Sequence, residues 1–231
     1  MRDSQVFMSF RSVCILRPIA SLIAAANISV SYAATVTWDG STDNQWATAS
    51  NWTPSGEPTE NDDVEFDYTA GSPIGTIVLA PSQRLTRSVS ILFSTSGTMT
   101  LGTNSATDAI SIESGELFEV KVSTGTIDYT VNVDSKILCD QDTIFDIQKP
   151  SGGTGLVHLM GEIANINSGF SKEGEGELRI SGEQGDYSSV ITVDEGLLNS
   201  YADWGRNSEF HLEDGTTLEI NADTVIGKVS V

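Results

Sequence analysis

The chain has 231 residues, with 12 lysines and arginines against 32 aspartates and glutamates, so its formal net charge at pH 7 is −20. This charge repels phosphate backbones and anionic lipid headgroups, which excludes non-specific nucleic-acid binding and membrane attachment through a basic patch. The hydrophobic fraction of 39% is too high for a disordered acidic chain, and the length suits one domain or an array of small repeats.

The first segment, residues 1–33, has the three parts of a secretory signal peptide. A basic start is followed by a mostly apolar run at residues 19–30 and by small residues that end at Ala33. Polar residues interrupt the run, which is shorter than the roughly 20 apolar residues that a bilayer span needs. We expect cleavage after Ala33 and a mature chain without a membrane span. The chain is then secreted, or associated with the cell surface or outer membrane.

Cleavage also changes the number of cysteines in the mature chain. Cys14 leaves with the signal peptide, so Cys139 is the single cysteine of the mature chain. An exposed thiol would be modified in an oxidising compartment, and the neighbours of Cys139 are apolar. We expect Cys139 to be a small buried core residue rather than a nucleophile.

The next segment, residues 34–68, is rich in tryptophan. Trp38, Trp46 and Trp52 are three of the four tryptophans in the chain. If exposed, they could stack on sugar rings and bind a ligand; if buried, they could cover the end of an apolar core. Capping is the favoured interpretation, and glycan binding is the alternative.

After Trp52, almost every apolar run is short and alternates with polar residues at the two-residue period of a half-buried strand. The alternation occurs at Met99/Leu101, Ile110/Ile112, Phe118/Val120/Val122, Val131/Val133, Leu178/Ile180, Ile191/Val193, Phe210/Leu212 and Leu218/Ile220. No segment has convincing helical spacing, and glycine-containing turn pairs separate the runs. The chain is therefore predicted to be all-β, with strands recurring every 8–12 residues or so, as in sandwiches, barrels and β-solenoids.

Internal repetition favours a β-solenoid over residues 69–231. Glycine shortly precedes apolar residues in residues 176–180, 195–198 and 214–220, at a spacing near 20 residues. In a solenoid the inward apolar residues of successive coils form continuous ladders, and the outward residues are free to vary. The numerous carboxylates would then occupy the solvated outer face.

Residues 169–182 and 187–198 resemble the autotransporter-associated β-strand repeat. That pattern is kept at Lys172, Gly174, Gly176, Leu178, Ile180, Gly182, Tyr187, Thr192, Val193, Gly196 and Leu198. The likeness extends over residues 156–220, and the tryptophan-rich segment is similar to the start of many secreted bacterial proteins with this repeat. The resemblance implies a right-handed parallel β-helix of the passenger type, opened by an N-terminal Trp-rich capping segment at residues 34–68.

Other candidate sites have weaker signals. Acidic groups that could bind calcium occur at Asp39/Asp43, at Glu60/Asp62/Asp63/Glu65/Asp67 and at Asp140/Asp142/Asp146. They lack the residue order of an EF-hand, so a solvated acidic face is preferred and no metal or cofactor is expected. His158 and His211 stand between apolar residues and are predicted to point outward. Neither histidine belongs to a hydrolase sequence motif.

The function that these features favour is that of a secreted, non-enzymatic β-solenoid, an elongated acidic rod with a structural, adhesive or surface-display role. One alternative is a carbohydrate-binding β-sandwich that uses the tryptophans. A third is a polysaccharide-active β-helix enzyme, because some parallel β-helices cleave glycosides with paired carboxylates. Expected partners are surface glycans, or a protein bound at an open C-terminal end, since residues 225–231 resemble a further strand.

Overall fold

The computed structural model describes residues 33–69, 74–79, 82–103, 105, 107–112, 116–139, 142–164, 169–182, 190–204, 207–221 and 227–231. The chain divides into two units, Met1–Ser31 and Tyr32–Val231, and every described residue belongs to the second. Apart from Ala33, the predicted signal peptide therefore lies outside the described residues.

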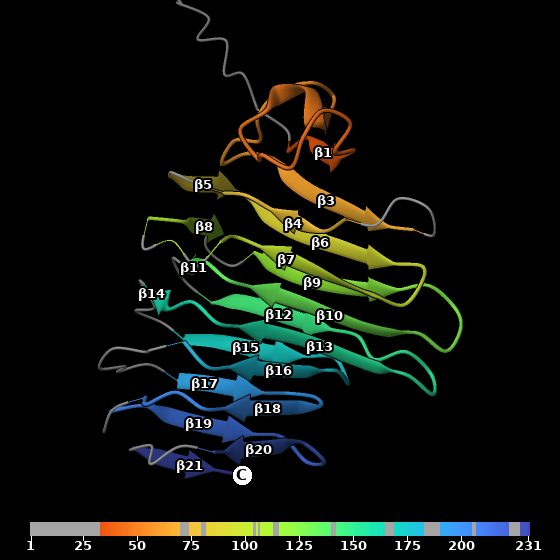
Figure 1. The fold of residues 1–231 in the computed structure, drawn as a ribbon. Helices are drawn as coiled ribbons and strands as arrows, with labels where there is room; N and C mark the ends of the chain where they lie inside the picture. Colours follow the sequence, from red (N-terminus) through yellow and green to blue (C-terminus); the bar gives the residue numbers. More distant parts are fainter. Residues whose placement is uncertain are drawn as a thin grey trace, which may run out of the picture. The chain divides into compact units, whose positions relative to one another are not determined.

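In its described part the second unit consists of three sheets (Figure 1). Sheet A has ten strands, in spatial order β2 (Trp52–Thr53), β1 (Thr35–Trp38), β3 (Asp63–Tyr68), β6 (Ser88–Phe93), β9 (Leu117–Val122), β12 (Thr143–Ile147), β15 (Gly169–Glu173), β17 (Val190–Val193), β19 (Glu209–Leu212) and β21 (Lys228–Ser230). Sheet B has seven, β20 (Thr217–Ile220), β18 (Leu197–Ser200), β16 (Glu177–Ile180), β13 (Thr154–Leu159), β10 (Asp128–Val133), β7 (Gly97–Leu101) and β4 (Thr76–Ile77). Sheet C has four, β14 (Ile163–Ala164), β11 (Lys136–Cys139), β8 (Ala109–Ile112) and β5 (Gln83–Thr86).

The chain passes through sheets A, B and C in turn and then returns to sheet A one strand further along. Four such circuits start at β3, β6, β9 and β12, and from β15 onward the described chain alternates between sheets A and B alone. The circuit shortens accordingly: Asp63 pairs with Ser88, 25 residues later, whereas Val190 pairs with Glu209, 19 residues later. This order is compatible with a β-solenoid.

Pairing between strands of successive circuits is parallel throughout the described part, and β1–β2 is the antiparallel exception. The prediction of an all-β chain with long parallel sheets is confirmed. The two-layer antiparallel sandwich assumed for a carbohydrate-binding module is not the fold observed. The helical element described is one short 3-10 turn at Ala49–Asn51, and no described helix is long and apolar enough to cross a membrane.

The core lies between the sheets because alternate residues of each strand point inward. One inward ladder on sheet A runs through paired positions of successive coils, Val64, Val89, Phe118, Phe145, Lys172 and Val193, all of them fully buried. Sheet B contributes a parallel ladder of Met99, Val131, Val157, Leu178 and Leu198. Because hydrophobic burial is the main favourable term in folding, these ladders stabilise the stack.

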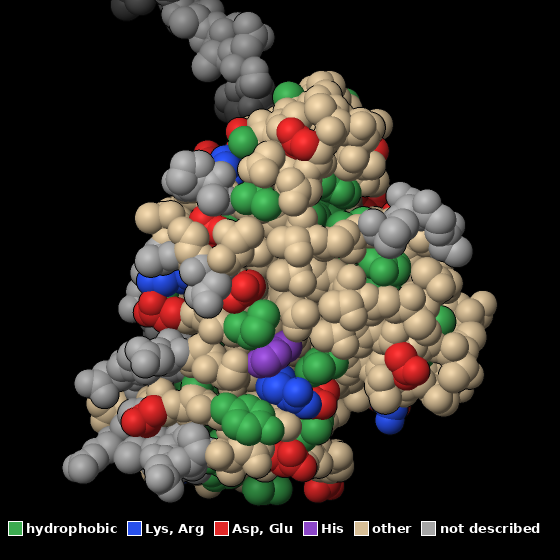
Figure 2. Space-filling model, viewed as in Figure 1, with side chains coloured by type: hydrophobic (Ala, Val, Ile, Leu, Met, Phe, Trp, Pro, Cys, Tyr) green, Lys and Arg blue, Asp and Glu red, His purple; other side chains and the backbone are tan. Residues whose placement is uncertain are grey.

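Polar and charged residues take many of the outward positions of the same strands, together with apolar residues such as Leu92, Leu138 and Ile144. Figure 2 shows acidic side chains scattered over the face in view, with few lysines and arginines. Cys139 is buried in β11, as predicted. The burial of apolar residues falls in the last described coils, where Leu212, Leu218 and Ile220 are only partly buried.

Candidate functional site

The three tryptophans proposed as ligand-binding candidates lie together in the core beside β3. Trp38, Trp46 and Trp52 are 7%, 0% and 1% exposed. Trp52 makes edge-to-face contacts with Trp38 and Trp46 at centroid distances of 4.9 and 4.8 Å, and all three contact the ring of Phe66. Because the rings are this deeply buried, glycan stacking would require them to leave the core.

Local hydrogen bonds explain how a loop-rich segment holds these rings. The indole nitrogen of Trp52 donates to the carbonyl of Trp46 at 2.7 Å. The buried Asn51 side chain accepts from the backbone nitrogens of Thr42 and Asp43 and donates to the carbonyl of Gln45. Asn51 therefore satisfies the backbone of the turn that places Trp46 and Trp52.

A different candidate lies on the outer face of sheet A. Four carboxylates occupy paired positions of successive coils: Glu119 pairs with Asp146, Asp146 pairs with Glu173, and Asp194 follows Val193, the partner of Lys172. We call Glu119, Asp146, Glu173 and Asp194 the carboxylate column. Neighbouring strands are about 4.8 Å apart, so like charges face each other along the column.

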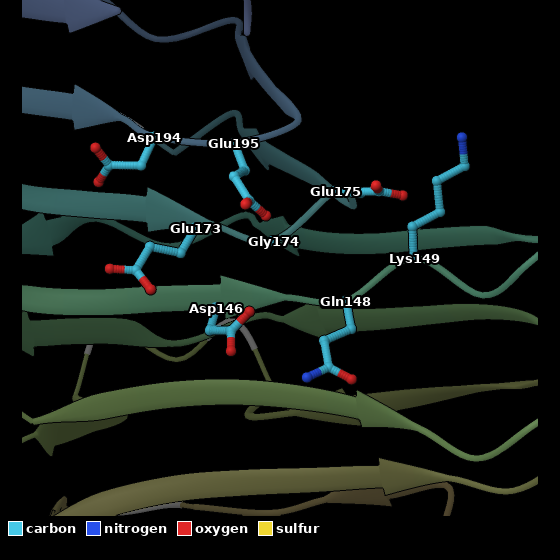
Figure 3. Close-up of a pocket in the computed structure, with 8 residues that line it drawn as sticks. All are labelled: Asp146, Gln148, Lys149, Glu173, Gly174, Glu175, Asp194 and Glu195. Atoms are coloured by element: carbon cyan, nitrogen blue, oxygen red, sulfur yellow. The ribbon is translucent and has the colours of Figure 1, made fainter. Parts of the chain in front are cut away.

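The column borders a groove of about 540 Å³ at the turn from sheet A to sheet B (Figure 3). Its other lining residues are Gln148, Lys149, Gly174, Glu175 and Glu195. In Figure 3, carboxylates from three successive coils lie on one side of the groove, and Lys149 is the single basic side chain drawn. The groove is therefore strongly acidic.

Lys172 lies directly beneath this groove at an inward core position. Its side chain is fully buried, and its ammonium donates to the carbonyls of Glu173, Gly174 and Glu195 at 2.6, 2.5 and 3.2 Å. Glu195 belongs to the next coil, so Lys172 connects two coils. The three hydrogen bonds to carbonyls and the attraction of the Asp146, Glu195 and Glu173 carboxylates offset the cost of burying this ammonium.

Burial and neighbouring charge shift the ionisation of these groups. Burial and the Glu119 carboxylate raise the pKa of Asp146, although the Lys172 ammonium opposes this effect. Burial and the Asp194 carboxylate likewise raise the pKa of Glu173. Burial lowers the pKa of Lys172 to about 8, against the attraction of Asp146, Glu195 and Glu173.

We expect Lys172→Met to remove a pH dependence of stability. The ordinary lysine pKa is 10.5, so between pH 8 and 10.5 the unfolded chain keeps a proton that folded Lys172 has lost. The free energy of unfolding of the wild type, relative to Lys172→Met, should therefore rise by about 3 kcal/mol across this window. Urea titrations at several pH values measure it. Lys149→Met is the control, and a flat difference for Lys172→Met would contradict the buried ammonium.

We expect Glu173→Gln to stabilise the chain at pH 7, because it removes one of the facing charges of the column. The gain should be roughly 0.5–1 kcal/mol at low salt and shrink in 0.5 M NaCl. Since the pKa of Glu173 is raised, acidification protonates this carboxyl and removes the repulsion that destabilises the wild type. The free energies of unfolding of the wild type and Glu173→Gln should therefore become equal near pH 4. Glu219→Gln on β20 is the exposed control and should change stability by less than about 0.5 kcal/mol.

Several of the acidic residues considered for calcium bind other parts of the chain itself. Asp39 accepts from the backbone nitrogen of Ser41, and Asp43 accepts from that of Gln45. Hydrogen bonding by the side chain and backbone of Ser41 lowers the pKa of Asp39, and the bond from Gln45 lowers the pKa of Asp43. Asp63 forms an ion pair with Arg87 at 2.5 Å. Asp140 lies outside the described residues. Among the residues with described placement, no three His, Cys, Asp or Glu side chains are grouped as a metal site would need.

The two histidines lie on outward positions, as predicted. The His158 ring nitrogen Nε2 is 2.8 Å from the Ser181 hydroxyl, and burial lowers the pKa of this imidazole. His211 is exposed and lies 3.1 Å from a carboxylate oxygen of Glu209. Within the described residues no carboxylate is hydrogen-bonded to His158, so its contact with Ser181 is a pair and not a catalytic triad.

The sequence alone does not predict the groove or the burial of Lys172. A signal was present, since Lys172 follows Phe170 at the two-residue period that marks inward positions. The carboxylate column was not visible because coil lengths differ, so Glu119, Asp146 and Glu173 recur every 27 residues and Asp194 follows after 21.

Comparison with known proteins identifies no relative: no protein-family model, curated protein or solved structure matches the chain. Its function must therefore be inferred from its own residues.

Proposed function

We propose that the chain is a secreted, non-enzymatic β-solenoid of the autotransporter passenger type, with a structural, adhesive or display role at the cell surface. Residues 1–33 are its signal peptide, residues 34–68 its tryptophan-rich cap, and the coils wind in the right-handed sense. The observation that carries the proposal is the stack of parallel circuits, in which outward side chains form columns that a partner can contact over several coils.

The repeat glycines support this proposal. Gly174 and Gly196 lie in successive coils and have the same positive φ of 72°. A Cβ on Gly196 would come within 2.5 Å of the Gly174 carbonyl oxygen, so side chains are excluded where the two coils meet. Both positions belong to the pattern that residues 169–198 share with the autotransporter-associated repeat.

The burial of Trp38, Trp46 and Trp52 against Phe66 supports the cap, because these rings cover apolar surface at the first coil. The segment also supplies β1, which pairs with β3 and covers the edge of sheet A. An unpaired edge at the start of a stack would otherwise be open to other chains.

Export and role are tested on the full chain produced in a bacterial host with a general secretory pathway. We expect the product outside the cytoplasm to have the intact mass of residues 34–231, and a cytoplasmic product that retains its N-terminus would contradict secretion. The exported product should release no reducing sugar from neutral or acidic polysaccharides. More beads coated with the exported product than beads coated with albumin should be retained on glycan-coated or protein-coated surfaces. Equal retention of the two kinds of bead on every surface would contradict adhesion.

A further inference from the structure

Residues 35–46 cover the edges of two of the three sheets at the first coil. On sheet A, β1 pairs with β3. Next to β4 of sheet B, Val78 donates to the Asn44 carbonyl at 2.8 Å, and Trp46 donates to the Val78 carbonyl at 3.0 Å. On sheet C, β5 is the end strand, and β8 is its neighbour on one side (Figure 1).

The other edge of β5 faces the segment at residues 57–61. The backbone nitrogen of Arg87, just after β5, donates to the Asp62 carbonyl at 2.9 Å. Alternate residues of a strand present their backbone groups to the same edge, so those of Leu85 and Gln83 face this side as well. Among the described residues neither has a backbone partner there, and Pro58 in the facing segment has no N–H to donate.

A groove of about 460 Å³ lies along this edge. It is lined by Glu57, Pro58, Thr59, Glu60 and Asn61 on one side and by Gln83, Arg84 and Leu85 on the other. Arg84 and Glu57 form an ion pair at 2.5 Å across it, while Glu60 is exposed at its rim. The Leu85 side chain is 40% exposed and supplies an apolar contact.

We propose that this groove binds an extended peptide segment of a partner protein, which adds a strand to sheet C beside β5 and places a basic side chain near Glu60. An open strand edge recognises extended backbone through main-chain hydrogen bonds. The occupant is basic because Glu60 and the net charge of −20 attract cations. The same charge opposes pairing between two copies of this chain.

The test uses the full chain and a fluorescent eight-residue peptide of alternating lysine and valine, with fluorescence anisotropy as the readout. The matched probe is the same peptide with N-methyl groups on alternate amides, which keeps its charge and removes hydrogen-bond donors along one edge. We expect the N-methyl peptide to bind at least about tenfold more weakly. Equal binding of the two peptides, or no saturable binding of the first below about 1 mM, would overturn the proposal.

Two variants with the same change in net charge locate the site. Glu60→Lys should weaken binding of the lysine–valine peptide by roughly 3- to 10-fold, whereas Glu219→Lys, on β20, should change it less than about twofold. Equal effects of the two variants would mean that the peptide is attracted to the acidic surface in general and does not bind in the groove beside Glu60. Leu85→Pro removes an edge N–H and should abolish binding.

If Leu85→Pro fails to fold, hydrogen exchange of the unmodified chain tests whether the edge of β5 is open. The amides of Gln83 and Leu85 should exchange faster than the amides of β8, and the lysine–valine peptide should slow their exchange. Strong protection of both amides in the free chain would show that the edge is already paired. Sedimentation that shows a dimer abolished by Leu85→Pro would identify a second copy as the occupant and overturn the proposal.

Discussion

Trp52→Ala is expected to lower the free energy of unfolding by about 3–5 kcal/mol, the cost of removing a large buried ring from a packed core. The side chain is 1% exposed and contacts Trp38, Trp46 and Phe66, so its loss leaves a cavity that three rings border. Urea unfolding followed by circular dichroism measures the change, because tryptophan fluorescence itself is altered by the substitution. A loss below about 1 kcal/mol would mean that the rings do not form a packed cluster.

The effect should also be local. In a stack where each coil contacts its neighbours, a defect weakens the nearest coils first. Hydrogen exchange of Trp52→Ala should show lost protection in β1 and β3 and unchanged protection in β17. Equal losses in β3 and β17 would mean that the tryptophan segment acts on the whole stack and not as a cap on its first coil.

Substitution by phenylalanine separates packing from hydrogen bonding. Trp52→Phe removes the 2.7 Å bond to the Trp46 carbonyl, whereas the indole nitrogen of Trp46 is buried without a hydrogen-bond partner. Trp52→Phe should therefore cost about 1 kcal/mol more than Trp46→Phe, although both lose similar ring area. Equal costs would contradict the hydrogen bond.

The strands could be predicted from the sequence because burial on one face imposes a two-residue period on each strand. Ile110 and Ile112 in β8, for example, point inward, and the polar Ser111 between them points outward. Parallel stacking was inferred from repetition and resemblance, and the paired registers confirm it. Local alternation alone could not separate a solenoid from a sandwich, because both have half-buried strands.

The sites were harder to predict because they depend on register between coils of unequal length. Glu119, Asp146 and Asp194 come together because β9, β12, β15 and β17 pair in order, which no single segment reveals. The tryptophans show the opposite case: their clustering was visible in the sequence, but their burial depends on Phe66 and the turn around Asn51. Lys172 breaks the usual rule that inward positions are apolar, and only the three carbonyls around its ammonium explain why.

Gly169→Ala is the second substitution with a large expected effect, because it tests the spacing of the coils directly. Gly169 pairs with Val190 of the next coil and has a φ of 105°. A Cβ at this position would lie 1.7 Å from the Val190 carbonyl oxygen, so the backbone of one coil would have to move. Backbone strain and this clash together should cost roughly 3–5 kcal/mol or prevent folding.

Gly125→Ala is the matched control, since Gly125 also has a positive φ, 128°, but a Cβ there would meet nothing within 4 Å. It should show the backbone strain alone, about 1–3 kcal/mol. The difference between the two variants in urea unfolding isolates the close approach of β15 and β17. If Gly169→Ala were as stable as Gly125→Ala, the backbones could not approach so closely at this point, and the register that builds the carboxylate column would be wrong as well.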